Sequence, residues 1–98
     1  MKTVTICGSM RFADDMMKIA TRLETERGFC VLQPVYSFDG QPLRDDELAR
    51  IKAAHCKKID LSDAVYIVNI GGYIGQSVTE EIAFAKSRGK EIIFHEPM

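Results

Sequence analysis

Long apolar runs are missing from this chain of 98 residues. No segment approaches the roughly 20 consecutive apolar residues that a membrane-spanning helix needs. The first apolar run, Val4 to Cys7, is also far too short for the hydrophobic region of a secretory signal peptide. These absences predict a soluble, cytoplasmic protein with no membrane partner.

Cysteine is scarce, with only Cys7, Cys30 and Cys56 in the chain. An odd number cannot form a complete disulfide framework, and free thiols in a reducing cytosol are the simplest explanation. No group of Cys, His, Asp and Glu has the short spacing typical of zinc sites, and no GxSxG elbow is present. We therefore expect neither a metal nor serine-hydrolase chemistry.

An excess of charge of one sign is also missing, with 13 Lys and Arg against 14 Asp and Glu. The helical stretches 11–27 and 44–60 each mix both signs, whereas a nucleic-acid groove needs a basic stripe. The glycine motifs GxGxxG and GxxxxGK[ST] are absent too. Nucleic acid is therefore not an expected partner, and the common dinucleotide and triphosphate sites lose support.

What the sequence does contain is a regular alternation of apolar runs and amphipathic stretches. We expect strands at 4–7, 29–32, 64–68 and 91–95, and helices at 10–27, 43–59 and 78–88. Gly28 and Gly89 end the first and third helices, and Asp39-Gly40 predicts a turn. The length fits one domain, residues 1–98, with a core small enough that a second subunit would add burial.

This βαβαβαβ order predicts an α/β fold. We expect a three-layer, flavodoxin-like or Rossmann-like sandwich with helices on both faces of a four-stranded parallel sheet. The expected strand order is 2-1-3-4. In that order the loops after the first strand (8–11) and the third strand (69–77) lie side by side at the switch point, where open α/β sheets hold ligands.

Two adjacent glutamates, Glu80 and Glu81, stand near the start of the predicted third helix. Ser77 and Glu80 fit a capping box, in which each side chain bonds the backbone N–H of the other residue, so Glu80 has a structural explanation. Glu81 lacks one. It falls at the flank of the buried stripe, where the alternatives are a functional carboxylate and a glutamate paired with a lysine or arginine.

Other candidates lie mainly in the same two loops. Gly8, Ser9 and Arg11 offer exposed amides, a hydroxyl and a guanidinium that suit a phosphate, and the alternative is an ordinary turn with Ser9 as N-cap. Asn69 ends the third strand and is well placed to face a ligand. His55 lies in the middle of a buried helical stripe, where a core histidine bonded to a neighbour is expected.

These residues resemble those of the nucleoside 2-deoxyribosyltransferase superfamily, which includes deoxynucleoside 5′-monophosphate N-glycosidases. The resemblance rests on a first strand that ends in Gly8-Ser9, an Asp before an apolar third strand (63–68), a Gly/Ser loop, and the segment EIAFAKSRGK (81–90). That segment matches the family pattern Glu-Leu-Gly-x-Ala followed by Gly-Lys. In this register Glu81, not Glu80, is the equivalent of the family's nucleophile.

The resemblance implies an N-glycosidase or deoxyribosyltransferase-like enzyme that acts on a nucleoside or its monophosphate, as a homodimer and without a cofactor. Glu81 would attack the anomeric carbon while the base leaves through an oxocarbenium-like transition state. Asp63 matches a family Asp that helps handle the leaving base, although it precedes the third strand, far from the ligand edge. Ser9 and Arg11 would hold a 5′-phosphate.

Two positions depart from the family pattern. Six residues before Glu81 the family usually carries Asp or Ser, where this chain has Gly75, and nearby Ser77 is the candidate substitute. The first-strand tyrosine that orients the nucleophile in the transferases corresponds to Thr5. These departures leave open a hydrolase, a different N-ribosyl substrate, or a non-catalytic domain that binds or senses a nucleotide.

Overall fold

The computed structural model describes residues 1–36 and 42–98. Its elements are β1 (Thr3–Gly8), the short 3₁₀ helix η1 (Met10–Phe12), α1 (Ala13–Arg27), β2 (Cys30–Leu32), α2 (Asp45–Leu61), β3 (Ala64–Val68), the 3₁₀ helix η2 (Ile70–Gly72), α3 (Gln76–Ser87) and β4 (Glu91–Phe94). The predicted order of strands and helices is confirmed. The predicted Asp39-Gly40 turn lies outside the described residues.

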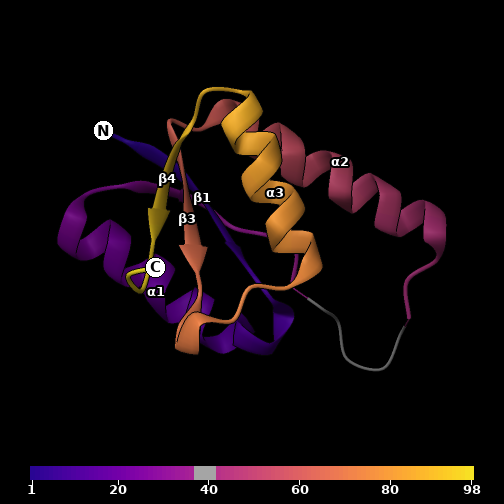
Figure 1. The fold of residues 1–98 in the computed structure, drawn as a ribbon, viewed down its shortest axis with the longest axis horizontal. Coiled ribbons are helices and arrows are strands. Elements are labelled where there is room, and N and C mark those ends of the chain that lie inside the picture. The colour runs from indigo at the N-terminus through magenta and orange to yellow at the C-terminus, as the bar shows by residue number, and fades with distance from the viewer. Residues whose placement is uncertain (37–41) are drawn as a thin grey trace.

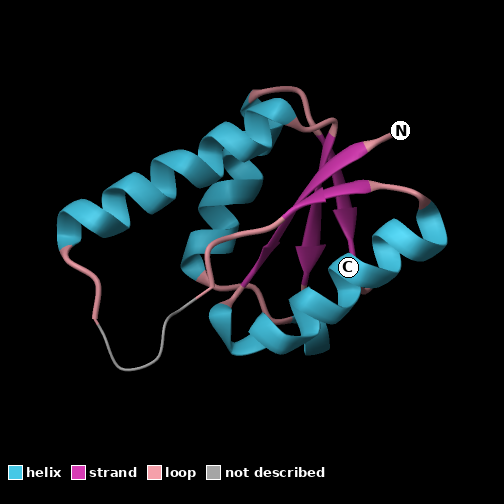
Figure 2. Ribbon diagram, turned by 180° about the vertical axis from the view of Figure 1, so that it is seen from behind, coloured by secondary structure: helices cyan, strands magenta, loops and turns pink. Residues whose placement is uncertain are grey.

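The four strands form one parallel sheet in the order β2-β1-β3-β4, as the sequence predicts. All five residues of β3 are buried, which is expected of a central parallel strand that is covered on both faces. Figures 1 and 2 show α1 on one side of the sheet and α2 and α3 on the other. The α/β three-layer sandwich is therefore confirmed.

Successive side chains of the central strands point to opposite faces, and this alternation divides the core into two layers. Val4 and Ile6 of β1 pack in one cluster with Met16 of α1. Cys7, the next residue of β1, belongs to the other cluster, together with Ile59 of α2. The end of β1 thereby presents Cys7 to the helices that carry His55 and Glu81.

Close packing at the end of β1 requires glycine. A Cβ atom built on Gly8 would lie 2.7 Å from Sδ of Met16 and 3.1 Å from Cβ of Val68. The absence of a side chain therefore lets α1 lie directly against the carboxyl ends of β1 and β3. The loop that follows β1 is held at the switch point by this contact.

Helix α2 is buried along only part of its predicted apolar stripe. His55 is 8% exposed and Ile59 is fully buried, whereas Leu48 is 50% exposed. Figure 1 shows the reason, because the first turns of α2 extend past the sheet. None of the helices in residues 1–36 and 42–98 is long and apolar enough to cross a bilayer.

The predicted capping box at the start of α3 is wrong. The helix begins at Gln76 with Gly75 as its N-cap, and Ser77 lies inside the first turn. The carbonyl of Gly75 already accepts the N–H of Thr79 at 3.0 Å, which closes the first helical turn two residues earlier than the pattern predicts. Glu80 bonds side chains instead of the backbone of Ser77.

Candidate functional site

A cleft of about 790 Å³ lies at the carboxyl ends of the strands. Gly8 and Ser9 line it from the loop after β1, Gly75 and Ser77 from the start of α3, and Glu81 from the second turn of α3. Residues of α2 line the facing side. The cleft is therefore at the switch point that the strand order predicts.

Glu81 lines the cleft with a side chain that is 25% exposed. Its Oε1 atom lies 3.5 Å from Nε2 of His55. The alternative explanation from the sequence, an ion pair with a lysine or arginine, does not occur among the described residues. Glu81 is thus a half-buried carboxylate in the cleft, and its neighbour among the described basic side chains is the His55 imidazole.

His55 is the site residue that sequence reasoning missed. Its predicted burial is correct, but Nε2 lies 3.5 Å from Sγ of Cys7 as well as 3.5 Å from Glu81. Within the described residues Nδ1 has no hydrogen-bond partner. Chain topology places only the early turns of α2 at the carboxyl edge of the sheet, and His55 lies beyond them, so no sequence signal pointed to its contact with Glu81.

Cys7, at the end of β1, completes what we call the Cys7–His55–Glu81 cluster. Its sulfur and the nearest donor atoms of His55 and Glu81 all lie within 4.8 Å of one another. Burial first, and the charge of Glu81 second, raise the pKa of the Cys7 thiol well above its ordinary value. The thiol is therefore protonated at neutral pH and is not a nucleophilic thiolate.

Residue spacing did not reveal this cluster because its members come from three different elements. Cys7 and His55 are 48 positions apart in the sequence, and short zinc-type spacings detect only ligands that share a local turn. The expectation that no metal binds therefore rested on local patterns alone.

Arg11, whose backbone is bonded to Ser9, connects the two loops at the switch point. The Ser9 hydroxyl accepts the N–H of Arg11 at 3.3 Å and caps η1, so the turn explanation for Ser9 holds while Ser9 also lines the cleft. The Arg11 guanidinium lies 3.7 Å from the ring centroid of Tyr73, a cation–π contact between the loops. Tyr73 lines the cleft, and Arg11 does not.

Two predicted site residues, Asn69 and Asp63, lie away from the cleft. Asn69 is fully buried, and its amide donates to the Glu96 carbonyl at 2.9 Å and accepts the Glu96 N–H at 2.8 Å. Asp63 precedes β3 at the opposite end of the strand, where its carboxylate accepts the Thr3 N–H at 2.8 Å. Both side chains hold backbone segments together, and neither is available to a ligand in the cleft.

Glu80 and Lys52 join α3 to α2 at the cleft, with Glu80 Oε1 3.2 Å from the Lys52 Nζ atom. The Gln76 amide donates to the other oxygen of Glu80 at 3.3 Å. Hydrogen bonds from Gln76 and then from Lys52 lower the pKa of Glu80. Lys52 and Gln76 therefore already hold the Glu80 carboxylate, whereas neither of them contacts Glu81.

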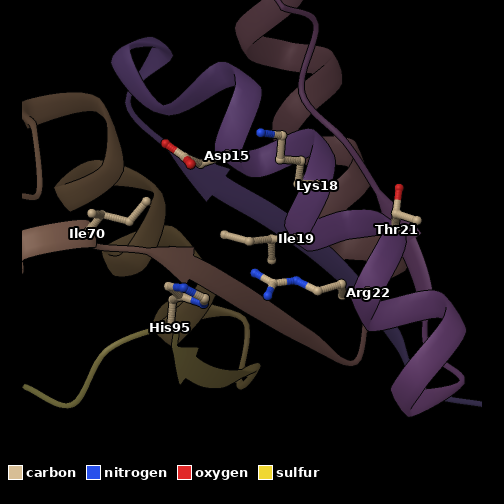
Figure 3. Close-up of a pocket in the computed structure, with 7 residues that line it drawn as sticks. All are labelled: Asp15, Lys18, Ile19, Thr21, Arg22, Ile70 and His95. Carbon is tan, nitrogen blue, oxygen red and sulfur yellow. The ribbon is translucent and has the colours of Figure 1, made fainter.

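A second pocket, of about 440 Å³, lies over α1 on the other face of the sheet (Figure 3). Lys18, Arg22 and His95 supply basic groups around Ile19. None of the residues predicted to act on a substrate lines this pocket. The candidate chemistry is therefore confined to the cleft.

No protein-family model and no curated protein matches this chain. Among solved structures, the chain is similar to the CMP N-glycosidase BcmB of Clostridium botulinum, with a TM-score of 0.60 and 21% sequence identity. The likeness covers 95% of this chain and 67% of that chain. It establishes a shared fold over nearly all of this chain.

Proposed function

We propose that this protein is an N-glycosidase that releases the base from a nucleoside 5′-monophosphate, with Glu81 as the nucleophile. The observation that carries the proposal is the position of Glu81. It is a half-buried carboxylate that lines the cleft at the switch point and has no basic side chain other than His55 against it among the described residues. The shared fold with a CMP N-glycosidase supports the choice of reaction and substrate class.

The reaction has two displacements at the anomeric carbon. A carboxylate oxygen of Glu81 attacks C1′, the C1′–N bond breaks, and its electron pair leaves with the base, which takes up a proton. Water then attacks C1′ of the glycosyl-enzyme ester and frees the carboxylate. The first step needs a carboxylate that is free to reach C1′. Lys52 and Gln76 already hold both oxygens of Glu80, which favours Glu81 as the nucleophile.

His55 supports the nucleophile where the family resemblance would place a tyrosine. The corresponding residue, Thr5, is buried, and its hydroxyl lies 2.6 Å from that of Ser62, so it is already engaged. His55 contacts Glu81 directly through Nε2. We therefore assign the orientation of the Glu81 carboxylate to His55.

The start of α3 suits a 5′-phosphate. The N-cap is Gly75, and no side chain in the described part of the chain caps this helix, so its first backbone N–H groups remain available to an anion. Ser77 lines the cleft one helical turn before Glu81, a separation of about 6 Å along the axis. This spacing places phosphate and anomeric carbon on one face of α3.

Base release from cytidine, uridine, adenosine and guanosine monophosphates and their deoxy forms, followed by liquid chromatography, tests the proposal. We expect Glu81→Gln to reduce release by about a thousandfold or more, since the nucleophile is lost. Glu80→Gln, which makes the same change at the preceding residue, is the matched control, and we expect it to retain activity. Release that survives in Glu81→Gln and disappears in Glu80→Gln would refute the assignment.

A nucleotide-binding domain without turnover is the second candidate, and Gly75 is the observation that favours it. The family resemblance calls for a polar side chain there, and glycine supplies none. Nucleotide binding measured by calorimetry, without any base release by the wild type, would establish this alternative. The predicted homodimer stays a prediction, which light scattering of the purified protein tests.

A further inference from the structure

The Cys7–His55–Glu81 cluster combines three donor types that bind transition metals. The thiol sulfur and the imidazole Nε2 are 3.5 Å apart, and Nε2 and the carboxylate oxygen are 3.5 Å apart. Ligand atoms around a tetrahedral zinc ion, at about 2.3 Å for sulfur and about 2.0 Å for nitrogen, lie roughly 3.3 to 3.6 Å from one another. The two separations that involve Nε2 fit ligands on one tetrahedral ion, and the third pair, Sγ and the carboxylate oxygen, lies within 4.8 Å.

Cys7 and Glu81 approach the same ring nitrogen of His55, and this distinguishes the cluster from the Cys-His-acid relay of a catalytic cysteine. In a relay the histidine contacts the nucleophile through one ring nitrogen and the carboxylate through the other. Here Cys7 and Glu81 both lie against Nε2, and Nδ1 has no partner among the described residues. Three donor atoms gathered within 4.8 Å of one another are the arrangement that a metal ion requires.

We propose that this cluster binds a thiophilic divalent cation, with Zn²⁺ as the ion whose chemistry fits best. Thiolate and imidazole ligands select zinc among the common biological cations, and a carboxylate completes three protein ligands. On binding, the Cys7 thiol loses its proton to solvent, so thiolate and carboxylate together neutralise the ion. Three protein ligands leave the fourth position of a tetrahedral ion to water.

Among the residues that the structure describes, Nδ1 of His55 has no acceptor, and this limits the expected affinity. Histidine ligands usually donate their second N–H to an acceptor, and loss of that acceptor typically weakens metal binding by about 10- to 100-fold. We therefore expect binding weaker than at a structural zinc site. The ion and a glycosyl group would also compete for the same carboxylate, so Zn²⁺ inhibits base release; only this consequence rests on the proposed function.

Cobalt titration of the chelator-treated protein tests the site without any enzymatic assay. We expect Co²⁺ to produce a thiolate-to-metal charge-transfer band and the strong visible bands of tetrahedral cobalt, both saturating at one equivalent, and Zn²⁺ to displace it. Cys7→Ser should remove the charge-transfer band. Cys56→Ser, which changes a cysteine that also lines the cleft, is the matched control and should retain it.

Absence of the charge-transfer band in the wild type at excess Co²⁺ would overturn the proposal, as would its persistence in Cys7→Ser or its loss in Cys56→Ser. Since Cys7 is fully buried, Cys7→Ser could fail to fold, which circular dichroism detects. In that case Glu81→Gln decides. A loss of cobalt affinity of about tenfold or more supports the site, and unchanged affinity overturns it.

Discussion

At the scale of single residues, Gly8 has the least room for a side chain among the glycines that the structure describes. The Cβ atom of Gly8→Ala would approach Sδ of the buried Met16 to 2.7 Å, so the substitution overpacks the contact between β1 and α1. We expect a loss of about 1–3 kcal/mol in the free energy of unfolding, measured with urea. In a Met16→Ala background the same substitution should cost less, and an equal cost would contradict this explanation.

Cys7 provides a second prediction at this scale. Because burial and the charge of Glu81 raise its pKa, the folded protein should react with iodoacetamide at Cys30 and Cys56 before Cys7. Peptide mass spectrometry measures the order, and early labelling of Cys7 would refute it. Glu81→Gln removes one of the causes and should accelerate labelling of Cys7 at a given pH.

The raised pKa of the Cys7 thiol also predicts how the free energy of unfolding changes with pH. A thiol whose pKa is higher in the folded than in the unfolded chain contributes its stabilisation below the ordinary thiol pKa and loses it as the pH rises above that value. Unfolding curves at increasing alkaline pH should therefore show a steeper loss of stability in the wild type than in Cys7→Ala.

At the scale of elements, two substitutions at the start of α3 test whether the helix begins at Gln76 with Gly75 as its N-cap. Gly75 has an extended backbone that any residue adopts, and a Cβ there would only reach ordinary contact, 3.4 Å from the Tyr73 hydroxyl. Gly75→Ser should therefore supply the missing N-cap and raise the free energy of unfolding by roughly a few tenths of a kcal/mol.

Ser77→Ala should lower the free energy of unfolding by less than about 0.5 kcal/mol, since the Ser77 side chain does not cap α3. A larger loss of stability for Ser77→Ala, measured by thermal unfolding, would show that Ser77 does cap the helix and would contradict the corrected start.

The sequence predicted elements and their order well because each depends on local periodicity. The site was predicted only in part. Glu81 could be selected by helical position and family pattern, and the switch point follows from strand order. The contacts of Glu81 with His55 and Cys7 could not be predicted, because they depend on how far α2 extends along the sheet. The local pattern also gave a wrong helix start at Ser77, because the capping-box sequence Ser77 to Glu80 lies inside the first turns of α3.

At the scale of the whole molecule, Asn69 links the chain end to the loop after β3. Asn69→Ala removes both hydrogen bonds to the backbone of Glu96, so we expect faster trimming of the last residues by carboxypeptidase. Glu96→Gln leaves those backbone bonds intact and is the matched control. Equal trimming of the two variants would show that other contacts hold the chain end. Sequence pattern could not reveal this link, because the partner lies in a segment without regular structure.

The same pairing makes one backbone amide a reporter of the switch point. The N–H of Glu96 is bonded at 2.8 Å to a side chain that directly precedes η2, and η2 leads into the loop that borders the cleft. The hydrogen-exchange rate of the Glu96 amide should therefore rise when that loop opens. Glu96 does not line the cleft, so a ligand there need not contact it. A ligand in the cleft that restrains this loop should slow exchange of the Glu96 amide, which makes the last strand's C-terminal neighbour a test of occupancy.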